Sequence, residues 1–491
     1  MKIIVAALLI LFSTRGYSQD TVAWYDPIMV ADKTFGNLHP RISLDQDNHP
    51  LVLWGDPNGN AFISKWAGKD FSEPMKINTP GKYVFTESWA GPEMISTGDT
   101  IYVAYKELPE ETGHIFLKHS YDGGKNFSIP TAVDDSDNHI TRFPTVAIDP
   151  YGNPVVAYMQ LDKGFTNPRY AVGRSKDLGE TFSRAVEVPD YSGGRVSDCC
   201  PATVVESGDA NVIIYRGNQS GQRNIWAGVS STSGIAFKRG IQLDKTNWTT
   251  KDCVPNAPDG VIISDTLYSV YMSGAGDSSL VYLSKASVRG TSAIITPITG
   301  KLTGLGSQNF PRIANSGDAV ALAWEQSIGD NTQVCLFFTY EIAHGLPLTY
   351  DTIALGSFSN MDVGLGGGHI YVVYQDDSSG NLMCRIGRYN ETLVNRMLAQ
   401  STTVGLHPAT SGKYFVVSIP NISSCMMSDL DGKEYEMDLK CKKNACRVNT
   451  EDLDPGLYIV RIYCTDDKVY TYKYEVKEIQ EKTPAPKGEH F

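Results

Sequence analysis

Residues 120–127 read Ser-Tyr-Asp-Gly-Gly-Lys-Asn-Phe, and this stretch decides the fold because it recurs along the chain. A second copy, Ser-Lys-Asp-Leu-Gly-Glu-Thr-Phe, occupies residues 175–182. The shared pattern is Ser-x-Asp-x-Gly-x-x-Phe, with its defining residues at Asp122, Gly124 and Phe127 and at Asp177, Gly179 and Phe182. Degenerate copies without the Asp begin at Ser64 and Ser230, so successive copies start 55 or 56 residues apart. A fixed period of this length indicates a repeat architecture.

Each residue of the pattern has a physical reason to be in a hairpin turn. An Asp side chain accepts hydrogen bonds from turn amides, and Gly tolerates the positive φ that tight turns require. The Phe ring is then free to fill the gap between neighbouring sheets. The pattern therefore predicts structural residues at the outer end of each repeat.

A second pattern marks the start of each repeat: a proline, an apolar strand, a polar turn, and a strand that ends in an aromatic residue. The prolines are Pro40, Pro92, Pro144, Pro201, Pro255 and Pro311, and a seventh unit starts at Met361 without one. The closing aromatics are Trp54, Tyr105, Tyr158, Tyr215, Tyr271, Trp324 and Tyr374. Four strands in about 50 residues is the size of one propeller blade.

The sequence therefore predicts an all-β chain folded as a propeller, with seven blades preferred and six as the alternative. Residues Ile28 to Val30 resemble the strand that precedes each unit start. We expect this N-terminal strand to complete the last blade and so to close the ring.

The ends of the chain differ from its middle. Lys2 followed by the apolar run Ile3 to Phe12 predicts a signal peptide over residues 1–18, cleaved before Gln19. We expect no membrane span after this cleavage, and the propeller is expected over residues 19–404. The formal net charge of −12 argues against nucleic acid as a partner. The predicted location is secreted or at the cell surface, with the periplasm as the alternative.

The Asp-containing repeat resembles the Asp box, also called the BNR repeat, of sialidases and related propellers. The resemblance implies that the box is structural and lies away from the active site. Sialidases clamp the substrate carboxylate with three arginines, attack with a Tyr activated by a Glu, and use an Asp as acid and base. The corresponding candidates are Arg41, Arg142, Arg216, Arg223 and Arg312 for ligand binding, and Glu87, Tyr271 and Asp198 for catalysis.

Residues just before the unit starts are expected to converge at one mouth of the central channel. Besides Arg41, Arg142 and Arg312, this set contains the ligand-binding candidates His39 and Trp89. Its other polar members are Glu87, Asp198, Asp252 and Asn309. Cations, carboxylates and an aromatic ring suit an anionic or hydroxyl-rich ligand such as a glycan. We expect no cofactor and no metal. The stretch Asp45-Gln46-Asp47-Asn48 is interpreted as a hairpin turn.

The chain has nine cysteines, and this odd number leaves at least one outside any internal pair. Cys199 and Cys253 precede successive unit starts, so a bridge between adjacent blades is predicted, either Cys199–Cys253 or Cys200–Cys253. The last four cysteines, which are expected to form two further disulfides, are Cys425, Cys441, Cys446 and Cys464.

The repeat spacing ends near residue 405, and residues 405–478 are expected to form a small β-sandwich. This segment resembles the sorting domain of the type IX secretion system of gliding and oral bacteria. The matching residues are Pro408, Gly412, Asp429, Asp431, Gly432, Lys433, Leu453, Gly456 and Tyr458. The resemblance implies secretion machinery as a partner. The cysteines and the polar tail 479–491 depart from that family, so an accessory β-sandwich without an export role is the alternative.

Two functions follow from these patterns. The first is a propeller that binds or hydrolyses extracellular glycans, with exo-α-sialidase as the candidate activity. The alternative is a non-catalytic propeller for protein interaction, adhesion or envelope assembly, because a fold does not fix a function. Three arginines facing a hydrogen-bonded Tyr and Glu would favour hydrolysis, whereas arginines paired to local acids would favour binding.

Overall fold

The computed structural model describes residues 22–134, 138–299, 306–347 and 349–389, and then 406–408, 414–417, 422–428, 433–442, 445–465 and 469–476. The chain divides into two compact units, Met1–Tyr389 and Asn390–Phe491. The predicted signal peptide, the tail 479–491 and the predicted boundary at residue 404 lie outside the described residues. Each unit is described by itself.

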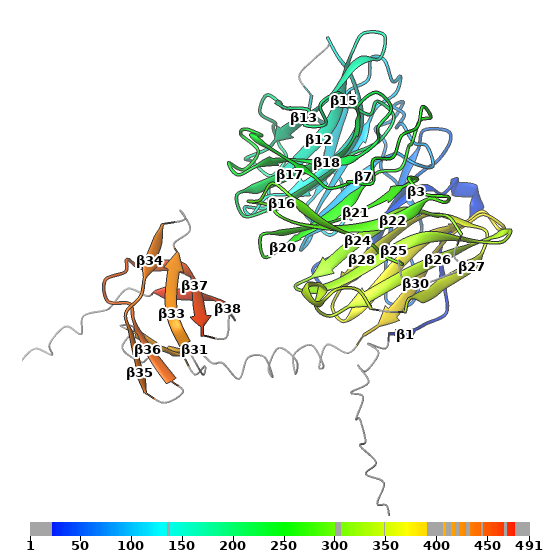
Figure 1. Cartoon of the computed structure of the whole chain (residues 1–491). Coiled ribbons are helices and arrows are strands. Elements are labelled where there is room, and N and C mark those ends of the chain that lie inside the picture. The colour runs from blue at the N-terminus through cyan, green and yellow to red at the C-terminus, as the bar shows by residue number, and fades with distance from the viewer. Residues whose placement is uncertain are drawn as a thin grey trace, which may run out of the picture. The chain divides into compact units, whose positions relative to one another are not determined.

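The described residues of the first unit form seven antiparallel sheets (Figure 1). The first three contain β3 (Leu38–Leu44), β4 (Pro50–Gly55), β5 (Ala61–Lys65) and β6 (Met75–Lys76); β7 (Glu93–Thr97), β8 (Thr100–Lys106), β9 (Ile115–Ser120) and β10 (Thr131–Ala132); and β11 (Ile140–Ile148), β12 (Pro154–Asp162), β13 (Thr166–Arg174) and β14 (Val186–Val188). The fourth contains β15 (Arg195–Val196), β16 (Thr203–Ser207), β17 (Ala210–Asn218), β18 (Ile225–Ser230) and β19 (Arg239–Gln242).

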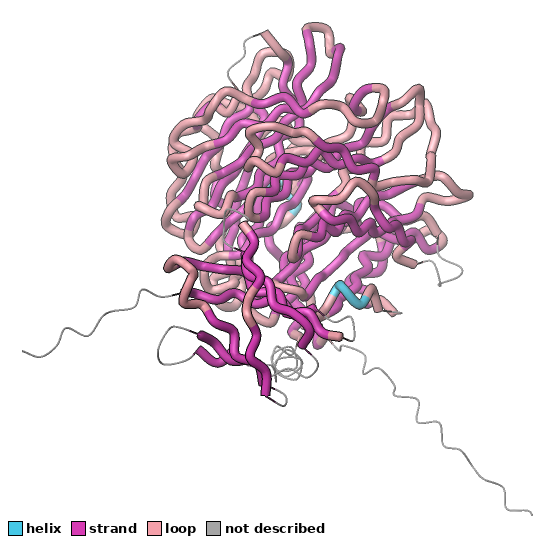
Figure 2. Tube along the Cα trace, turned by 60° about the vertical axis from the view of Figure 1, so that its left-hand side comes forward, coloured by secondary structure: helices cyan, strands magenta, loops and turns pink. Residues whose placement is uncertain are grey.

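The remaining three sheets follow the same plan. The fifth contains β20 (Asp259–Ile263), β21 (Thr266–Ser273), β22 (Leu280–Ser287) and β23 (Ala293–Pro297), and the sixth contains β24 (Gln308–Ser316), β25 (Ala319–Ile328), β26 (Asn331–Thr339) and β27 (Asp351–Gly356). The seventh contains β28 (Phe358–Gly366), β29 (His369–Asp376) and β30 (Asn381–Arg388), joined by β1 (Ala23–Trp24) and β2 (Ile28–Ala31). Short 3-10 helices at Lys33–Phe35 and Ile342–His344 interrupt the strands (Figure 2). The all-β propeller prediction is confirmed.

The N-terminal strands complete the last sheet, as predicted. β2 pairs antiparallel with β30, with Ile28 opposite Cys384 and Met29 opposite Met383. Val30 and Leu382 then pack against Val52 of the first sheet in one buried cluster. The two ends of the repeat array are therefore held together by main-chain hydrogen bonds and by apolar packing.

One strand from each sheet contributes to the inner lining of the ring, and neighbouring members of this set contact one another: β3, β7, β11, β16, β20, β24 and β28. Four of them contain, near their start, a residue at positive φ that lies within a register shift, namely His39, Phe143, Phe310 and Asn360. This repeated bulge is the structural form of the unit start. In the fifth sheet β20 begins at Asp259, directly after Pro258. The unit start placed at Pro255 is therefore three residues early.

The aromatic that closes each unit is a core residue. All seven of these side chains, from Trp54 in the first sheet to Tyr374 in the last, are at most 5% exposed. Each lies on the strand that pairs with the inner strand of its sheet, namely β4, β8, β12, β17, β21, β25 or β29. Tyr271 therefore occupies the position that Trp54 and Trp324 occupy in other sheets.

The Asp box forms the predicted turn. The Ser120 hydroxyl oxygen accepts the Gly124 amide at 2.9 Å, and Asp122 accepts the amides of Lys125 and Asn126, both at 3.0 Å. Gly124 has a φ of 78°, and Phe127 packs on the core between the first and second sheets.

The second copy repeats this arrangement. Gly179 donates to Ser175 at 2.8 Å and Thr181 donates to Asp177 at 2.9 Å, while Phe182 packs between the second and third sheets. In the degenerate copy the Gly234 amide still donates to the Ser230 hydroxyl oxygen, at 3.0 Å.

The described strands of the second unit form two four-stranded antiparallel sheets. One contains β31 (Leu406–Pro408), β32 (Tyr414–Val417), β35 (Leu439–Lys442) and β36 (Ala445–Asn449), and the other contains β33 (Ile422–Ser428), β34 (Glu434–Glu436), β37 (Gly456–Cys464) and β38 (Val469–Val476). Residues of both sheets share one core, as in a β-sandwich.

Part of the sorting-domain pattern can be located in this unit. Gly456 begins β37 and Tyr458 lies in the core, whereas Gly412, Asp429, Asp431 and Gly432 lie outside the described residues. Across the part of the chain that the structure describes, no helix combines the length and apolarity that a membrane crossing needs.

We predict that Asp122→Asn lowers the melting temperature at pH 7 and that the difference from wild type narrows below pH 4. Hydrogen bonds from Asn126 and Ser120 hold the pKa of Asp122 below its ordinary value of 3.8. A lowered carboxyl pKa stabilises the fold above that ordinary value, and this stability is lost as the pH falls through the folded-state pKa. Thermal unfolding of both proteins from pH 7 to pH 2 measures the effect. Asp277→Asn, at an exposed position, is the control, and an equal loss at all pH values would contradict the assignment.

Candidate functional site

The inner lining of the ring carries charge at one repeated position. The residue directly after the unit start is Arg41 on β3, Glu93 on β7, Asp259 on β20, Arg312 on β24 and Asp362 on β28. All five side chains are largely withdrawn from solvent. Burying isolated charges is costly, so each charge requires a partner.

The partners come from neighbouring sheets. Arg41 Nε lies 2.8 Å from Glu93 Oε2, and His39 Nε2 lies 2.9 Å from Glu93 Oε1. Arg312 Nε lies 2.8 Å from Asp362 Oδ1 and 3.5 Å from Asp259 Oδ2. We call these residues the inner ionic belt.

Two carboxylates of the belt also accept main-chain amides from the next sheet. Asp362 accepts the Ile42 amide at 3.0 Å, and Asp259 accepts the Ile313 amide at 3.0 Å. The belt thereby joins the first sheet to the second, the fifth to the sixth, the sixth to the seventh, and the seventh to the first.

Burial and the nearby Arg41 charge lower the pKa of His39 to about 4, so this imidazole is neutral at pH 7. Although burial opposes it, Arg41 and His39 hold the pKa of Glu93 well below its usual range. Three ligand-binding candidates, His39, Arg41 and Arg312, are therefore engaged in holding sheets together.

The three predicted catalytic residues lie on different elements of the first unit. Tyr271 is buried, and its hydroxyl donates to the Leu243 carbonyl at 2.9 Å. Burial, followed by the nearby Asp244 charge, raises the pKa of Tyr271 above its usual range. Glu87 is exposed in the loop before β7, and Asp198 is half-buried beside the fourth sheet. Among the described residues, no hydrogen bond joins Tyr271 to Glu87 or to Asp198.

Two further ligand-binding candidates lie together at the third sheet. Arg142 pairs with Glu110, and its guanidinium carbon lies 4.4 Å from the centre of the Phe143 ring. Trp89 packs edge-on against the same ring, with centroids 5.2 Å apart. Arg142 is thus neutralised locally, and half-buried Trp89 packs on the core.

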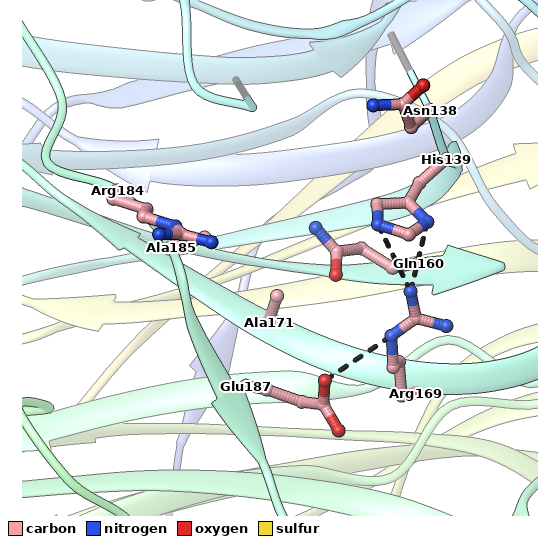
Figure 3. Close-up of a pocket in the computed structure, with 8 residues that line it drawn as sticks. All are labelled: Asn138, His139, Gln160, Arg169, Ala171, Arg184, Ala185 and Glu187. Carbon is pink, nitrogen blue, oxygen red and sulfur yellow. Dashed lines mark hydrogen bonds and ion pairs between the residues drawn. The ribbon is translucent and has the colours of Figure 1, made fainter. Parts of the chain in front are cut away.

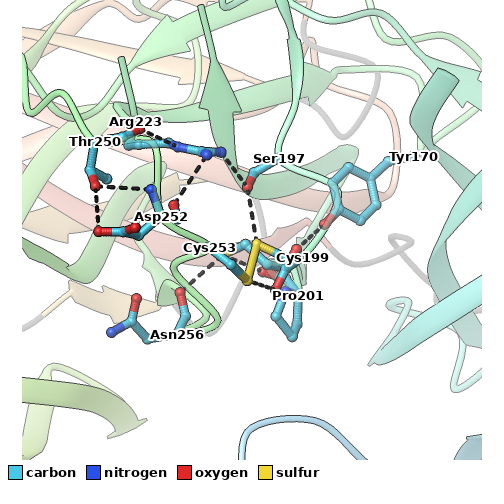
Figure 4. Close-up of a disulfide and its surroundings, with 10 residues drawn as sticks. Tyr170, Ser197, Cys199, Pro201, Arg223, Thr250, Asp252, Cys253 and Asn256 are labelled. Atoms are coloured by element: carbon cyan, nitrogen blue, oxygen red, sulfur yellow. Dashed lines mark hydrogen bonds between the residues drawn. A yellow bond between two sulfur atoms is a disulfide. The ribbon is translucent and has the colours of Figure 1, made fainter. Parts of the chain in front are cut away.

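The remaining arginines form the frame of a different site, between the fourth and fifth sheets (Figure 4). Arg223 donates to the Ser197 hydroxyl at 3.0 Å and to the Asp252 carbonyl at 3.2 Å. Buried Arg216 donates to the carbonyls of Arg223 and Met272, at 2.9 and 3.0 Å. These bonds fix the chain that precedes the fifth sheet against the ends of β15, β17 and β18.

A disulfide between Cys199 and Cys253 reinforces the same junction (Figure 4). It selects one of the two predicted pairings. Cys200 instead has a buried thiol whose sulfur lies 3.0 Å from the Asn256 carbonyl, and burial raises the pKa of this thiol. In the second unit Cys441 is bonded to Cys446, while the other two candidates, Cys425 and Cys464, lie in the core of the sandwich.

A cavity of about 550 Å³ opens beside this junction. Its lining residues are Gly194, Arg195, Asn218, Ser220, Gly221, Arg223, Thr250 and Lys251. Arg195 and Lys251 are exposed cations, and Asn218, Ser220 and Thr250 add amide and hydroxyl groups. We call this the rim cavity. Sequence reasoning found Arg223 but missed Arg195 and Lys251, because neither belongs to a motif.

A second cavity, of about 530 Å³, lies along the third sheet (Figure 3). Its central cation, Arg169, lies 2.9 Å from Asp162 and 3.4 Å from Glu187, and also donates to His139. Two carboxylates compensate Arg169, and the exposed Arg184 adds a second cation to the lining of this cavity.

Metal-ligand geometry among the described residues is limited to one turn. Asp45, Asp47 and His49 offer ligand atoms within 4.8 Å of one another between β3 and β4. Asp45 already accepts the amides of Asp47 and His49 at 2.9 and 2.8 Å. Those bonds form the hairpin turn that the sequence predicted.

Comparison with known proteins gives a fold and no family. No protein-family model matches the chain, and no curated protein matches it. One similar solved structure is a polysaccharide lyase, an ulvan lyase bound to the saccharide GlcA(1-4)Rha3S. It is 9% identical with a TM-score of 0.50, over 73% of this chain and 95% of the lyase.

Two other solved structures show comparable likeness. A sialidase of Trypanosoma rangeli is 10% identical with a TM-score of 0.45, over 92% of this chain and 89% of the sialidase. A protein of unknown function from Dyadobacter fermentans is 10% identical with a TM-score of 0.47, over 75% of this chain and 99% of that protein. At such identities the likeness concerns the propeller fold alone.

We predict that Arg312→Ala destabilises the first unit by about 3 kcal/mol, because it leaves two buried carboxylates without their partner. Urea or thermal unfolding measures this loss. The control is Arg289→Ala, which removes an exposed ion pair to Asp265 and should cost less than about 1 kcal/mol. Equal small losses in both variants would contradict the structural role of the belt.

We also predict that the double substitution Cys199→Ser and Cys253→Ser destabilises the first unit by about 4 kcal/mol, since the bridge spans 54 residues. The matched double substitution Cys441→Ser and Cys446→Ser, at positions only 5 residues apart, should lower the unfolding free energy of the second unit by about 2 kcal/mol. Melting temperatures of the three proteins under non-reducing conditions provide the comparison. A Cys199/Cys253 variant as stable as wild type would show that the junction does not need the bridge.

Proposed function

We propose that this protein is an extracellular propeller that binds anionic glycans at the rim cavity. The observation that supports this is the composition of that cavity, in which Arg195 and Lys251 are exposed beside Asn218, Ser220 and Thr250. Charge-assisted bonds from such cations recognise carboxylate or sulfate groups. The neighbouring amides and hydroxyls suit the hydroxyl groups of a sugar ring.

The frame of the cavity supports binding because it is rigid. Arg223 is fixed by Ser197 and by the main chain at Thr250 and Asp252. The Cys199–Cys253 bridge holds the same two segments together. A preformed site loses little conformational entropy when a ligand binds.

Binding is preferred over exo-α-sialidase activity because of where the predicted clamp residues lie. Arg41 and Arg312 are paired to carboxylates in the inner ionic belt, and Arg142 is paired to Glu110. Tyr271 lies in the core with its hydroxyl bonded to a main-chain carbonyl. A retaining sialidase reaction needs a nucleophile and acid together at the sugar. Arginines paired to local acids favour the binding alternative.

The ulvan lyase supports the choice of ligand class. Its structure holds GlcA(1-4)Rha3S, a saccharide that carries a carboxylate and a sulfate, on the same type of fold. We propose the same chemical class for this chain, with neither lyase nor hydrolase chemistry attached to it.

Export is part of the proposal. Disulfides form in oxidising compartments, so the Cys199–Cys253 and Cys441–Cys446 bridges support a secreted, surface or periplasmic location. We propose that the C-terminal β-sandwich contacts secretion machinery, on the strength of its sequence resemblance.

The test is titration of the purified protein with a glucuronate-containing tetrasaccharide and with its carboxyl-reduced, neutral counterpart. We predict tighter binding of the acidic form, and a loss of about tenfold in affinity for each of Arg195→Ala and Lys251→Ala, as expected for a hydrogen bond to a charged group. Affinity should also fall as salt is raised. Lys76→Ala, an exposed cation on β6, is the control and should bind as wild type does.

A fluorogenic sialoside is included in the same experiment. No turnover by the folded protein is the expected result. Turnover above the blank would contradict the preference for binding. Affinity for the acidic tetrasaccharide that is unchanged in both rim variants would contradict the location of the site.

A further inference from the structure

The sixth sheet carries a carboxyl group that neither the ionic belt nor the rim cavity uses. Glu325 follows the core residue Trp324 on β25 and is only partly exposed. In register it lies opposite Asn309, near the start of β24. Its Oε1 atom accepts the main-chain amide of Asn360 in the seventh sheet at 3.0 Å. Glu325 therefore lies between two sheets at the end of the ring where the first strands begin.

Residues with amide side chains lie on the strands next to Glu325 and in the neighbouring sheets. The Asn360 side chain donates to Gln375 Oε1 at 3.2 Å, and Asn256 of the neighbouring fifth repeat donates to Asn309 Oδ1. Asn309, Asn360 and Gln375 are each partly exposed. Asn256 is 3% exposed, and its Oδ1 atom has no hydrogen-bond partner in the structure. Buried polar atoms are normally paired, so Asn256 has unused hydrogen-bonding capacity beside Asn309. The Gln375 amide, by contrast, is held at both ends, because its Nε2 atom donates to Asp377 at 3.1 Å.

The charge state of Glu325 follows from its surroundings. Burial raises its pKa to about 8; the Asn360 amide opposes this shift and the Asp377 carboxylate, in the turn after β29, adds to it. Asp377 is the charged group that acts on Glu325 from the seventh sheet, and it has the same sign. At pH 7 the side chain is therefore mostly a neutral acid, which has an O–H donor as well as acceptors.

We propose that Glu325, Asn309, Asn360 and Gln375 form a second glycan subsite, which recognises uncharged sugar hydroxyls. The neutral carboxyl donates one hydrogen bond, and Asn309 Nδ2 and Asn360 Oδ1 add a further donor and acceptor, which suits the hydroxyls of a sugar ring. Gln375 holds the Asn360 side chain in place. This inference rests on the proposed glycan function. It adds a site that binds sugar hydroxyls to the rim cavity, which binds anionic groups.

The experiment measures affinity for the carboxyl-reduced tetrasaccharide at pH 6.5 and pH 9. Wild-type affinity should fall by about tenfold across this range, because the O–H donor is lost as the pH rises through the pKa of Glu325. Glu325→Gln keeps a donor at both pH values and should show no fall. Glu325→Leu should be about tenfold weaker at pH 6.5 and independent of pH. Asp330→Asn, an exposed carboxylate in the turn between β25 and β26, is the control and should behave as wild type.

Thermal unfolding supplies a readout that needs no ligand. A carboxyl whose folded-state pKa is raised destabilises the fold increasingly as the pH rises from its ordinary pKa of 4.5 to about 8. The gain in melting temperature of Glu325→Gln over wild type should therefore be larger at pH 9 than at pH 5. This measurement also establishes that the variants are folded.

The outcomes separate the two proposals. Suppose that Arg195→Ala and Lys251→Ala lower the affinity for the acidic tetrasaccharide, while Glu325→Leu changes neither the affinity for either saccharide nor its pH dependence. The subsite is then overturned and the proposed function stands. The subsite is also overturned if Glu325→Gln shows the same pH dependence of binding as wild type. If neither saccharide binds to the folded wild-type protein, the proposed function fails and the subsite fails with it.

Discussion

The ion pairs of Arg312 with Asp259 and Asp362 are the interaction on which the ring depends. They lie where the first strands of three sheets meet, and Arg41 with Glu93 makes the same type of link between the first two sheets. A largely buried charge is tolerated only when it is paired and hydrogen-bonded. Because Asp259 and Asp362 also accept main-chain amides, the pairs fix the register between sheets as well as their proximity. The aromatic side chains and the Asp-box phenylalanines then fill the space farther out.

This belt decides where a ligand can be recognised. Because Arg41 and Arg312 are paired to buried carboxylates of the belt, they do not offer a free charge to a carboxylate or sulfate of a ligand. Two exposed cations, Arg195 and Lys251, lie at the edge of the fourth and fifth sheets, on segments fixed by Arg223 and by the Cys199–Cys253 bridge. The protein as a whole is acidic, so attraction of an anionic glycan has to come from this local group. The proposed subsite around the neutral Glu325 side chain differs from the rim cavity, because it binds sugar hydroxyls and not anionic groups.

The features that the sequence predicted are those coded within short segments. The Asp box, the strand at Ile28 that completes the last sheet, and the bridge from Cys199 or Cys200 to Cys253 all follow from local spacing repeated at a fixed period. The partners of Arg41 and Arg312 lie 52 and 50 residues away, and only the superposition of repeats brings them together. The sequence pattern places the start of the fifth unit at Pro255, whereas β20 begins after Pro258, because the strand register cannot be read from the spacing of prolines. The core position of Tyr271 can be inferred from the repeat alone. Trp54 and Trp324 occupy the same place in their units and have no hydroxyl, so this place needs an aromatic ring and not a nucleophile.

The most direct test of this account is chemical modification of arginines by phenylglyoxal in the folded protein, mapped by peptide mass spectrometry with and without an acidic tetrasaccharide. The account predicts that exposed Arg195 reacts and that the saccharide protects it, while Arg41 and Arg312 react only after unfolding. Rapid modification of Arg41 or Arg312 in the folded protein, with protection by the saccharide, would contradict the account and return the clamp to the centre of the ring.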